Sequence, residues 1–275
     1  MNTEAKLSNN GQTGYMLQPP VSLTDTSGDP AMLEHHLVRR VLAEVRWSFN
    51  WPCNWLLGAG LNLALSLLWL AWVPLRGGSH GDWVILVGTY FAVFILADVT
   101  TTNVLGLDAP RVRVSLASGV PISRLLLTKN CALLVIVGAP TLLLTAILTL
   151  RSEVPYRLVL TLPGVALPIM AWLGVGNVVS VLLPVATRRL RQRWRERTNL
   201  PGTARWLSHL AVPYALLYLV DPVGDTPRTI LRMLPRSWRS AEMHGLLLAL
   251  TGLAIWTAGT LLACWIVRTR GIRVR

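Results

Sequence analysis

Hydrophobic residues in this chain gather into long runs separated by polar segments. A run of about twenty apolar residues matches the roughly 30 Å hydrocarbon core of a bilayer. The pattern therefore predicts an all-α, polytopic membrane protein whose transmembrane domain covers residues 53–267. Its six predicted transmembrane helices lie at 53–75, 83–106, 130–150, 158–184, 206–220 and 245–267.

A further helix is predicted ahead of the first span, over residues 31–52. Apolar residues recur there at every fourth position from Leu33 to Val45, while charged residues such as Glu44 occupy the other side. This spacing predicts an amphipathic interfacial helix that lies flat on the membrane, with Trp47 at the level of the headgroups.

A short helix is also predicted in the loop before the last span. Thr226 suits a helix N-cap and Pro227 suits the first helical position. The residues that follow give the segment a small apolar face, which predicts a helix that dips into the outer leaflet: Ile230, Leu231 and Leu234.

Both ends of the chain are polar. Residues 1–30 are rich in Asn, Thr, Ser, Gly and Pro, which is typical of a disordered tail, and residues 268–275 form a basic tail. Composition agrees with a membrane protein, because 52% of the residues are hydrophobic and 14% are charged. Soluble domains carry roughly a quarter charged residues.

Charge sets the predicted topology. The net charge is +13, and the basic residues cluster beside apolar runs, which favours contact with anionic lipid over nucleic acid. Segments on one side of the six spans hold eighteen Lys and Arg residues, against seven on the other side. Because cytoplasmic loops carry the excess of Lys and Arg, we expect both termini in the cytoplasm.

The sequence lacks the motifs of common enzymes. It has no phosphate-binding glycine loop, no HExxH zinc motif and no GxSxG nucleophile motif. The five histidines and three cysteines are scattered and form no ligand set. We therefore expect no catalytic residues, no metal and no cofactor in this chain.

Polar residues inside the predicted spans are candidates for function. Asp98 is the one acid well inside a span, and Asn103 follows it on the same segment. Asn177 and Ser180 stand three residues apart, so they share one helical face, and Gly174 one turn earlier allows a close helix approach. This polar seam either bonds neighbouring helices or contributes to a substrate pathway. Asp98 either bonds a neighbouring helix or takes part in substrate contact or proton coupling.

Two stretches carry a recognisable order of residues. The first is GNVVSVLLP at 176–184, which a basic loop follows. The second, 103–130, begins with an Asn and a Gly-containing turn, continues as an amphipathic segment, and ends with Pro, a hydrophobic residue, Ser, Arg and a Lys. The residues concerned are Asn103, Gly106, Pro121, Ile122, Ser123, Arg124 and Lys129. With six spans around them, these motifs resemble the permease subunits of ABC transporters of the ABC-2 type.

The resemblance implies the transmembrane subunit of an ABC exporter in a bacterial cytoplasmic membrane. A separate ATPase subunit would bind ATP and Mg²⁺, and the segment 107–126 would dock in a groove of that ATPase. A second permease, either another copy or a related chain, would enclose the pathway at the second and fifth spans. The implied ATPase-coupling residues are Arg111, Arg113, Pro121, Ile122, Ser123 and Arg124.

Two other classes of protein stay open at this point. A non-transporting membrane scaffold or assembly factor would share the apolar runs and the absence of catalytic motifs. An integral membrane enzyme is disfavoured by the missing acid, base and metal motifs. Whether an ATPase binds the chain separates the exporter subunit from the scaffold.

Overall fold

The computed structural model describes residues 30–49, 103–106, 108–184, 200–204 and 226–271, together with positions 64, 68, 208, 212 and 215. All regular secondary structure in these residues is helical, which confirms the all-α prediction for this part of the chain. Three of its helices are long and apolar enough to cross a membrane, as expected of a multi-pass membrane protein. They cover Ile122–Arg151, Pro155–Leu182 and Ala241–Arg270.

Several predicted features lie outside the described residues. These are the first and fifth spans except for single positions, all of the second span before residue 103, the N-terminal tail as far as residue 29, and Asp98. The count of six spans therefore stays a prediction.

The first long helix is built from three parts. These are α6 (Ile122–Leu133), a π-helical turn η1 (Leu134–Gly138) and α7 (Ala139–Ser152). The helix begins eight residues before the predicted start at residue 130. Pro121, with φ −66° and ψ 141°, is extended and so sets the helix start at the next residue.

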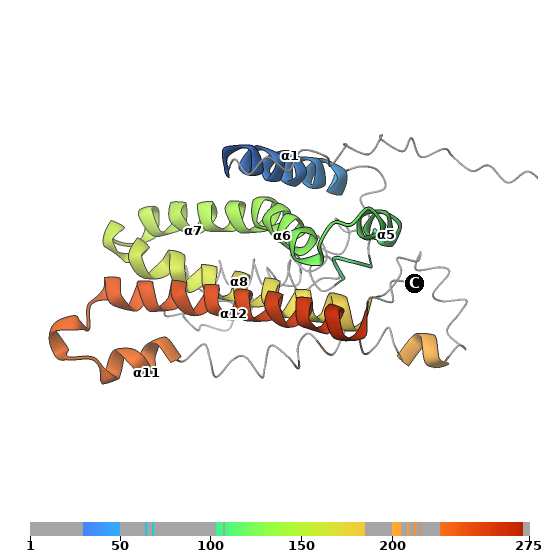
Figure 1. Cartoon of the computed structure of the whole chain (residues 1–275). Helices are drawn as coiled ribbons and strands as arrows, with labels where there is room; N and C mark the ends of the chain where they lie inside the picture. The colour runs from blue at the N-terminus through green and yellow to red at the C-terminus, as the bar shows by residue number, and fades with distance from the viewer. Residues whose placement is uncertain are drawn as a thin grey trace, which may run out of the picture.

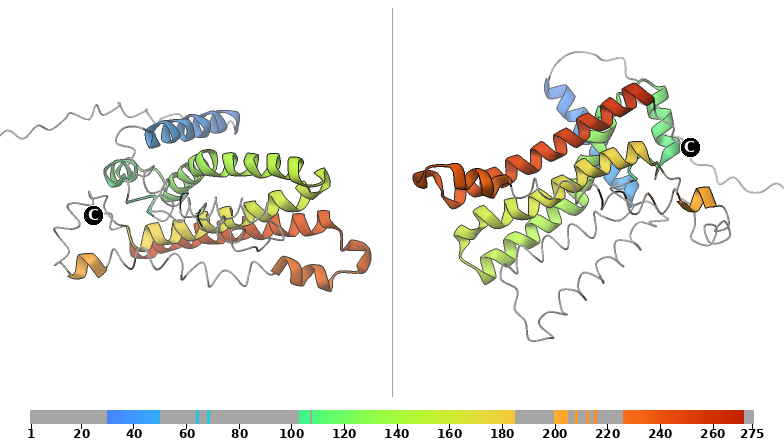
Figure 2. Two further views of the ribbon diagram at one scale, coloured as in Figure 1. Left: turned by 180° about the vertical axis from the view of Figure 1, so that it is seen from behind. Right: turned by 90° about the horizontal axis from the view of Figure 1, so that it is seen from below.

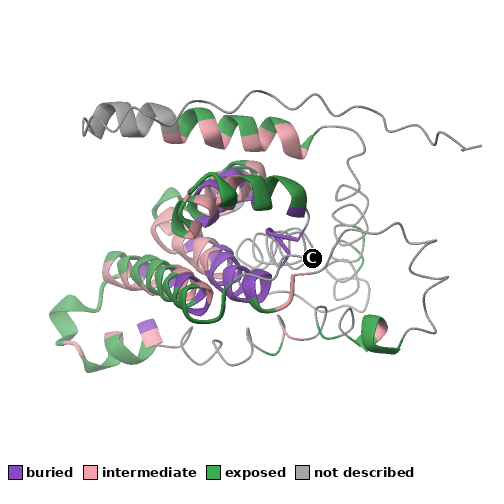
Figure 3. Cartoon of the chain, turned by 45° about the vertical axis from the view of Figure 1, so that its right-hand side comes forward, coloured by how far each residue is buried: buried purple, intermediate pink, exposed green. Residues whose placement is uncertain are grey.

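The other two long helices, α8 (Leu158–Leu182) and α12 (Ala241–Arg270), pack along one another and run in the same direction (Figure 1). A 3₁₀ turn, η2 (Pro155–Arg157), connects α7 to α8. The predicted span at 158–184 agrees closely with α8. Figure 3 shows that buried positions concentrate in the second half of α8.

Shorter helices lie at the two ends of this bundle. The helix α5 (Ala109–Ala117) lies near the C-terminal ends of α8 and α12 (Figure 1). The helix α11 (Thr226–Met233) and the 3₁₀ turn η3 (Arg236–Trp238) lie at the opposite end. The predicted helix at Thr226 is therefore present. The segment predicted to be cytoplasmic and the loop predicted to be outside lie at opposite ends of the long helices.

The amphipathic N-terminal helix α1 (Pro30–Ser48) contacts α6 and runs across the long helices in the right-hand view of Figure 2. It ends four residues before the predicted boundary at residue 52. Three apolar side chains on one side of α1 are about half exposed, and they are Val38, Leu42 and Phe49. The charged Glu44 is instead turned toward α6, with its side chain 12% exposed.

An apolar cluster holds α5 and α6 against the ends of α8 and α12. Its central members are almost completely buried, and Val112 of α5 and Leu126 of α6 are 1% and 0% exposed. The cluster comprises Leu105, Ala109, Val112, Leu126, Val178, Val181, Ala263, Cys264 and Ile266. This packing fixes the position of α5 and the residues just before it, where the candidate site lies.

Candidate functional site

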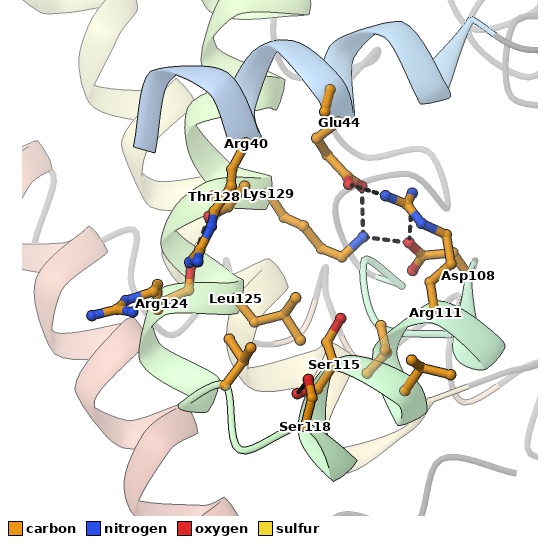
Figure 4. Close-up of a pocket in the computed structure, with 14 residues that line it drawn as sticks. Arg40, Glu44, Asp108, Arg111, Ser115, Ser118, Arg124, Leu125, Thr128 and Lys129 are labelled. Atoms are coloured by element: carbon orange, nitrogen blue, oxygen red, sulfur yellow. Dashed lines mark hydrogen bonds and ion pairs between the residues drawn. The ribbon is translucent and has the colours of Figure 1, made fainter. Parts of the chain in front are cut away.

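Four charged side chains from three segments meet between α1, α5 and α6. The Nζ atom of Lys129 on α6 lies 2.7 Å from Oε1 of Glu44 on α1 and 2.8 Å from Oδ2 of Asp108, the residue before α5. Arg111 on α5 contacts the same two carboxylates, at 3.3 Å from Glu44 and 3.5 Å from Asp108 (Figure 4). We refer to Glu44, Asp108, Arg111 and Lys129 as the charged junction.

Most of the charged junction is buried. The side chains of Asp108, Lys129 and Glu44 are 3%, 6% and 12% exposed, whereas Arg111 is 46% exposed. Two carboxylates face two cations, so the formal charges balance. In a buried pair of this kind, removal of one partner leaves an uncompensated charge and costs about 3–5 kcal/mol.

Local structure explains why Asp108 takes part. It occupies the N-cap position of α5, yet its side chain makes no capping hydrogen bond and accepts one from Lys129 instead. Burial raises the pKa of the Asp108 carboxyl above its ordinary value of 3.8, although Lys129 acts in the opposite direction. Its second oxygen, Oδ1, has no hydrogen-bond partner within the described residues.

An aromatic ring covers the cationic side of the junction. The guanidinium carbon of Arg111 lies 4.6 Å from the ring centroid of Trp47, and Nζ of Lys129 lies 5.8 Å from it. Cation–π contacts of this geometry add about 0.5–2 kcal/mol, and more when water is excluded. Trp47 therefore packs against the junction, in addition to any contact that it makes with headgroups.

A groove of about 310 Å³ opens beside the junction, between α1, α5 and α6. Besides the four junction residues, its lining includes two arginines, Arg40 and Arg124. Hydroxyl groups and small apolar side chains complete the walls, namely Ala43, Val112, Val114, Ser115, Ser118, Val120, Leu125 and Thr128. The groove thus combines excess positive charge with apolar surface.

The six residues predicted to couple to an ATPase fall into two groups. Arg111 is turned toward Glu44 and Asp108, and Ile122 packs against the apolar cluster under α5. The others are exposed along the outer edge of α5 and the first turn of α6, and they are Arg113, Pro121, Ser123 and Arg124. The structure therefore exposes five of the six, and Arg111, which is 46% exposed, also helps Ile122 to hold that surface in place.

The residues of the polar seam bond to different neighbours. The Oγ atom of Ser180 accepts a hydrogen bond from the backbone N–H of Val104 at 3.0 Å, next to the buried Asn103. Nδ2 of Asn177 donates to Oγ1 of Thr260 on α12 at 2.9 Å. Ser180 thus ties α8 to the turn at residues 103–106, and Asn177 ties α8 to α12.

Sequence reasoning missed the junction because its members are far apart along the chain. Glu44 and Lys129 are separated by 85 positions, and Asp108 and Lys129 by 21. One signal was available, since Lys129 is one of two lysines in the chain and precedes a long apolar run. A buried lysine in such a place requires a carboxylate partner.

Among the described residues, no group of three or more His, Cys, Asp or Glu side chains could hold a metal ion. Comparison with known protein families, with curated proteins and with solved structures finds no match for this chain. The functional inference therefore depends on the motif order in the sequence and on the geometry of the junction, the groove and the exposed edge of α5 and α6.

Proposed function

We propose that this chain is the transmembrane permease subunit of an ABC exporter, driven by a separate ATPase subunit that binds ATP and Mg²⁺. One observation carries the proposal. A short basic helix and the turn after it are exposed at one end of the long helices, at the place where the motif order predicts the ATPase contact. The charged junction and the apolar cluster support this exposed edge from behind.

The edge has the composition of a protein-docking surface. Val114 is 61% exposed, and Arg113, Pro121 and Arg124 lie exposed near it. Arg124 offers a planar fork of donors that suits a carboxylate on a partner, which a lysine would not reproduce. We infer that the ATPase presents an acidic groove with an apolar floor to this edge.

Force applied at the edge would have a direct route into the membrane domain. Arg124 lies in the first turn of a candidate span that continues from Ile122 to Arg151. The helix α5 is packed on the apolar cluster and joined to α6 through Lys129 and Asp108. Movement of α5 by an ATPase would therefore move the first long helix with it.

The transported substrate would pass between this chain and a second permease. Asn177 and Ser180 bond within the described bundle, which favours a packing role for the polar seam over direct substrate contact. The pathway would then be built by the second and fifth spans, as the resemblance implies.

The proposal is tested by reversing the charge of Arg124. In the full chain co-expressed with the ATPase of its gene neighbourhood, Arg124→Glu should lower ATPase co-purification by more than about tenfold, because like charges across an interface cost several kcal/mol. Arg232→Glu makes the same charge change on the exposed side of α11, at the opposite end of the bundle, and should leave co-purification unchanged.

Two outcomes would contradict the proposal. Equal co-purification for wild type and Arg124→Glu would remove the edge from the ATPase contact. If the wild-type chain retains no ATPase, the scaffold or assembly-factor alternative replaces the exporter.

A further inference from the structure

The groove beside the charged junction contains more positive charge than the junction needs. Glu44 and Asp108 are balanced by Lys129 and Arg111. Arg40 from α1 and Arg124 from α6 also line the groove. Neither guanidinium makes an ion pair or a hydrogen bond within the described part of the chain.

Figure 4 shows where the extra charge lies. The Arg40 side chain extends from α1 across to α6 and ends beside Thr128 and Arg124. Ser115 and Ser118 lie on the α5 wall of the same groove, and the bonded junction lies at the other end. A ligand in the groove would therefore meet Arg40 and hydroxyl groups without having to break the junction.

The remaining lining suits an amphiphile better than a small inorganic ion. Side chains of Val114, Val120 and Leu125 give the groove apolar walls. A free anion gains nothing from such walls, whereas the glycerol and first acyl carbons of a lipid would bury apolar area against them.

The position of the groove along the chain also favours a lipid as its ligand. It lies where a candidate span begins, at Ile122, and beside α1, which exposes Val38, Leu42 and Phe49 on one side. A span that enters the bilayer at Ile122 would place lipid headgroups at this level, and basic pockets at the cytoplasmic ends of membrane helices bind anionic headgroups.

We propose that this groove binds the phosphate headgroup of an acidic phospholipid. The guanidinium of Arg40 donates to the phosphate, Ser115 lies within the same groove, and Val120 and Leu125 contact the glycerol region. The bound lipid would fill the space between α1 and α5 and so stiffen the support behind the exposed edge. The proposal requires a membrane protein and does not depend on the exporter function.

The test counts lipids bound to the full chain, purified in non-ionic detergent without any ATPase. Phosphatidylglycerol and phosphatidylcholine are titrated in parallel and detected by native mass spectrometry. Wild type should prefer phosphatidylglycerol, and Arg40→Ala should reduce that preference about fivefold, the effect of one arginine near an anionic headgroup. Arg39→Ala is the matched control, because Arg39 is exposed on the same helix and does not line the groove.

Any of the following results would contradict a lipid-headgroup site in this groove. Equal losses for Arg39→Ala and Arg40→Ala would mean general surface attraction, and equal binding of the two lipids would exclude headgroup recognition. Displacement of phosphatidylglycerol by millimolar inorganic phosphate would reassign the groove to free phosphate. Arg40→Gln keeps a polar side chain in case truncation disturbs α1, and wild-type lipid preference in that variant would also overturn the assignment.

Discussion

The contact between α8 and α12 and the contact between α1 and α6 are held together by different physical means. Along α8 and α12, a Cβ atom on Gly259 would overlap the carbonyl oxygen of Gly174, so the two backbones touch. Between α1 and α6, long side chains reach across to form Glu44–Lys129. The first contact depends on the absence of side-chain atoms, whereas the second depends on the presence of charge.

The difference indicates how each contact tolerates change. Lipid tails are as apolar as leucine, so helices within a bilayer associate through close packing, which any added atom disturbs. The charged junction lies at the end of the bundle beside an open groove, where extra volume has space but a missing charge leaves its partners buried and unpaired. We therefore expect opposite sensitivities, which the following substitutions measure.

The largest effect should come from Lys129→Met. It leaves the carboxylates of Glu44 and Asp108 facing Arg111 alone, and we expect the free energy of unfolding to fall by about 3–5 kcal/mol. Denaturant unfolding of the purified chain, followed by circular dichroism, measures the loss. Arg113→Met is the control, since Arg113 is exposed and, within the described residues, bonds only to the carbonyl of Ala109 on its own helix.

Neutralising one acid sharpens this test. Asp108→Asn should cost less than Lys129→Met, because burial already raises the pKa of Asp108 and so disfavours its charged form. Should Lys129→Met and Arg113→Met lose the same stability, charge pairing does not hold α1 to α6.

The next effect concerns the glycine contact. Gly259→Ala should destabilise the chain by about 1–3 kcal/mol, the usual cost of overpacking, even though Ala is the better helix former. The same unfolding measurement applies, with Ala258→Leu as control because Ala258 is exposed on the same helix. A stability gain for Gly259→Ala would show that the two helices separate easily, and the proposed contrast with the junction would then be wrong.

The smallest effect should come from the hydrogen bond between Asn177 and Thr260. Such bonds between membrane helices are worth about 1 kcal/mol. Oδ1 of Asn177 is buried and has no partner among the residues that the structure describes, so Asn177→Leu also removes an unsatisfied group. We expect normal membrane insertion and a loss of at most about 1 kcal/mol. A double-mutant cycle with Thr260→Val isolates the bond, and strictly additive losses would mean that the two side chains do not interact.

Local pattern was enough to predict the most uniform helix. The span predicted at 158–184 ends two residues beyond α8, because the segment is uncharged and mostly apolar and Arg157 and Pro184 bound it. The helix that begins at Ile122 was predicted too short. Arg124 and Lys129 interrupt its first turns, and a hydropathy pattern cannot distinguish a paired buried lysine from an exposed one.

The local sequence pattern could not predict which distant segments pair with one another. Gly174 was identified as a place for close approach, but nothing near it in the chain selects Gly259 as the residue opposite. Glu44 likewise has the same periodicity as the other charged residues of α1, and its burial follows from Lys129, which belongs to another helix. Such partners become visible only when the helices are placed together.

The π-helical turn at Leu134–Gly138 bears on how chains related to this one could diverge in length. A π-turn accommodates about one residue more than an α-turn, so deletion of one residue there would leave a regular helix. Because the wide turn absorbs the extra residue, the helix after the deletion would keep its orientation relative to α6. The contact of α6 with α1 and that of α7 with α8 would then both survive, with the buried face of α7 still in place: Thr141, Thr145 and Thr149. A chain one residue shorter at this turn could therefore keep the same packing.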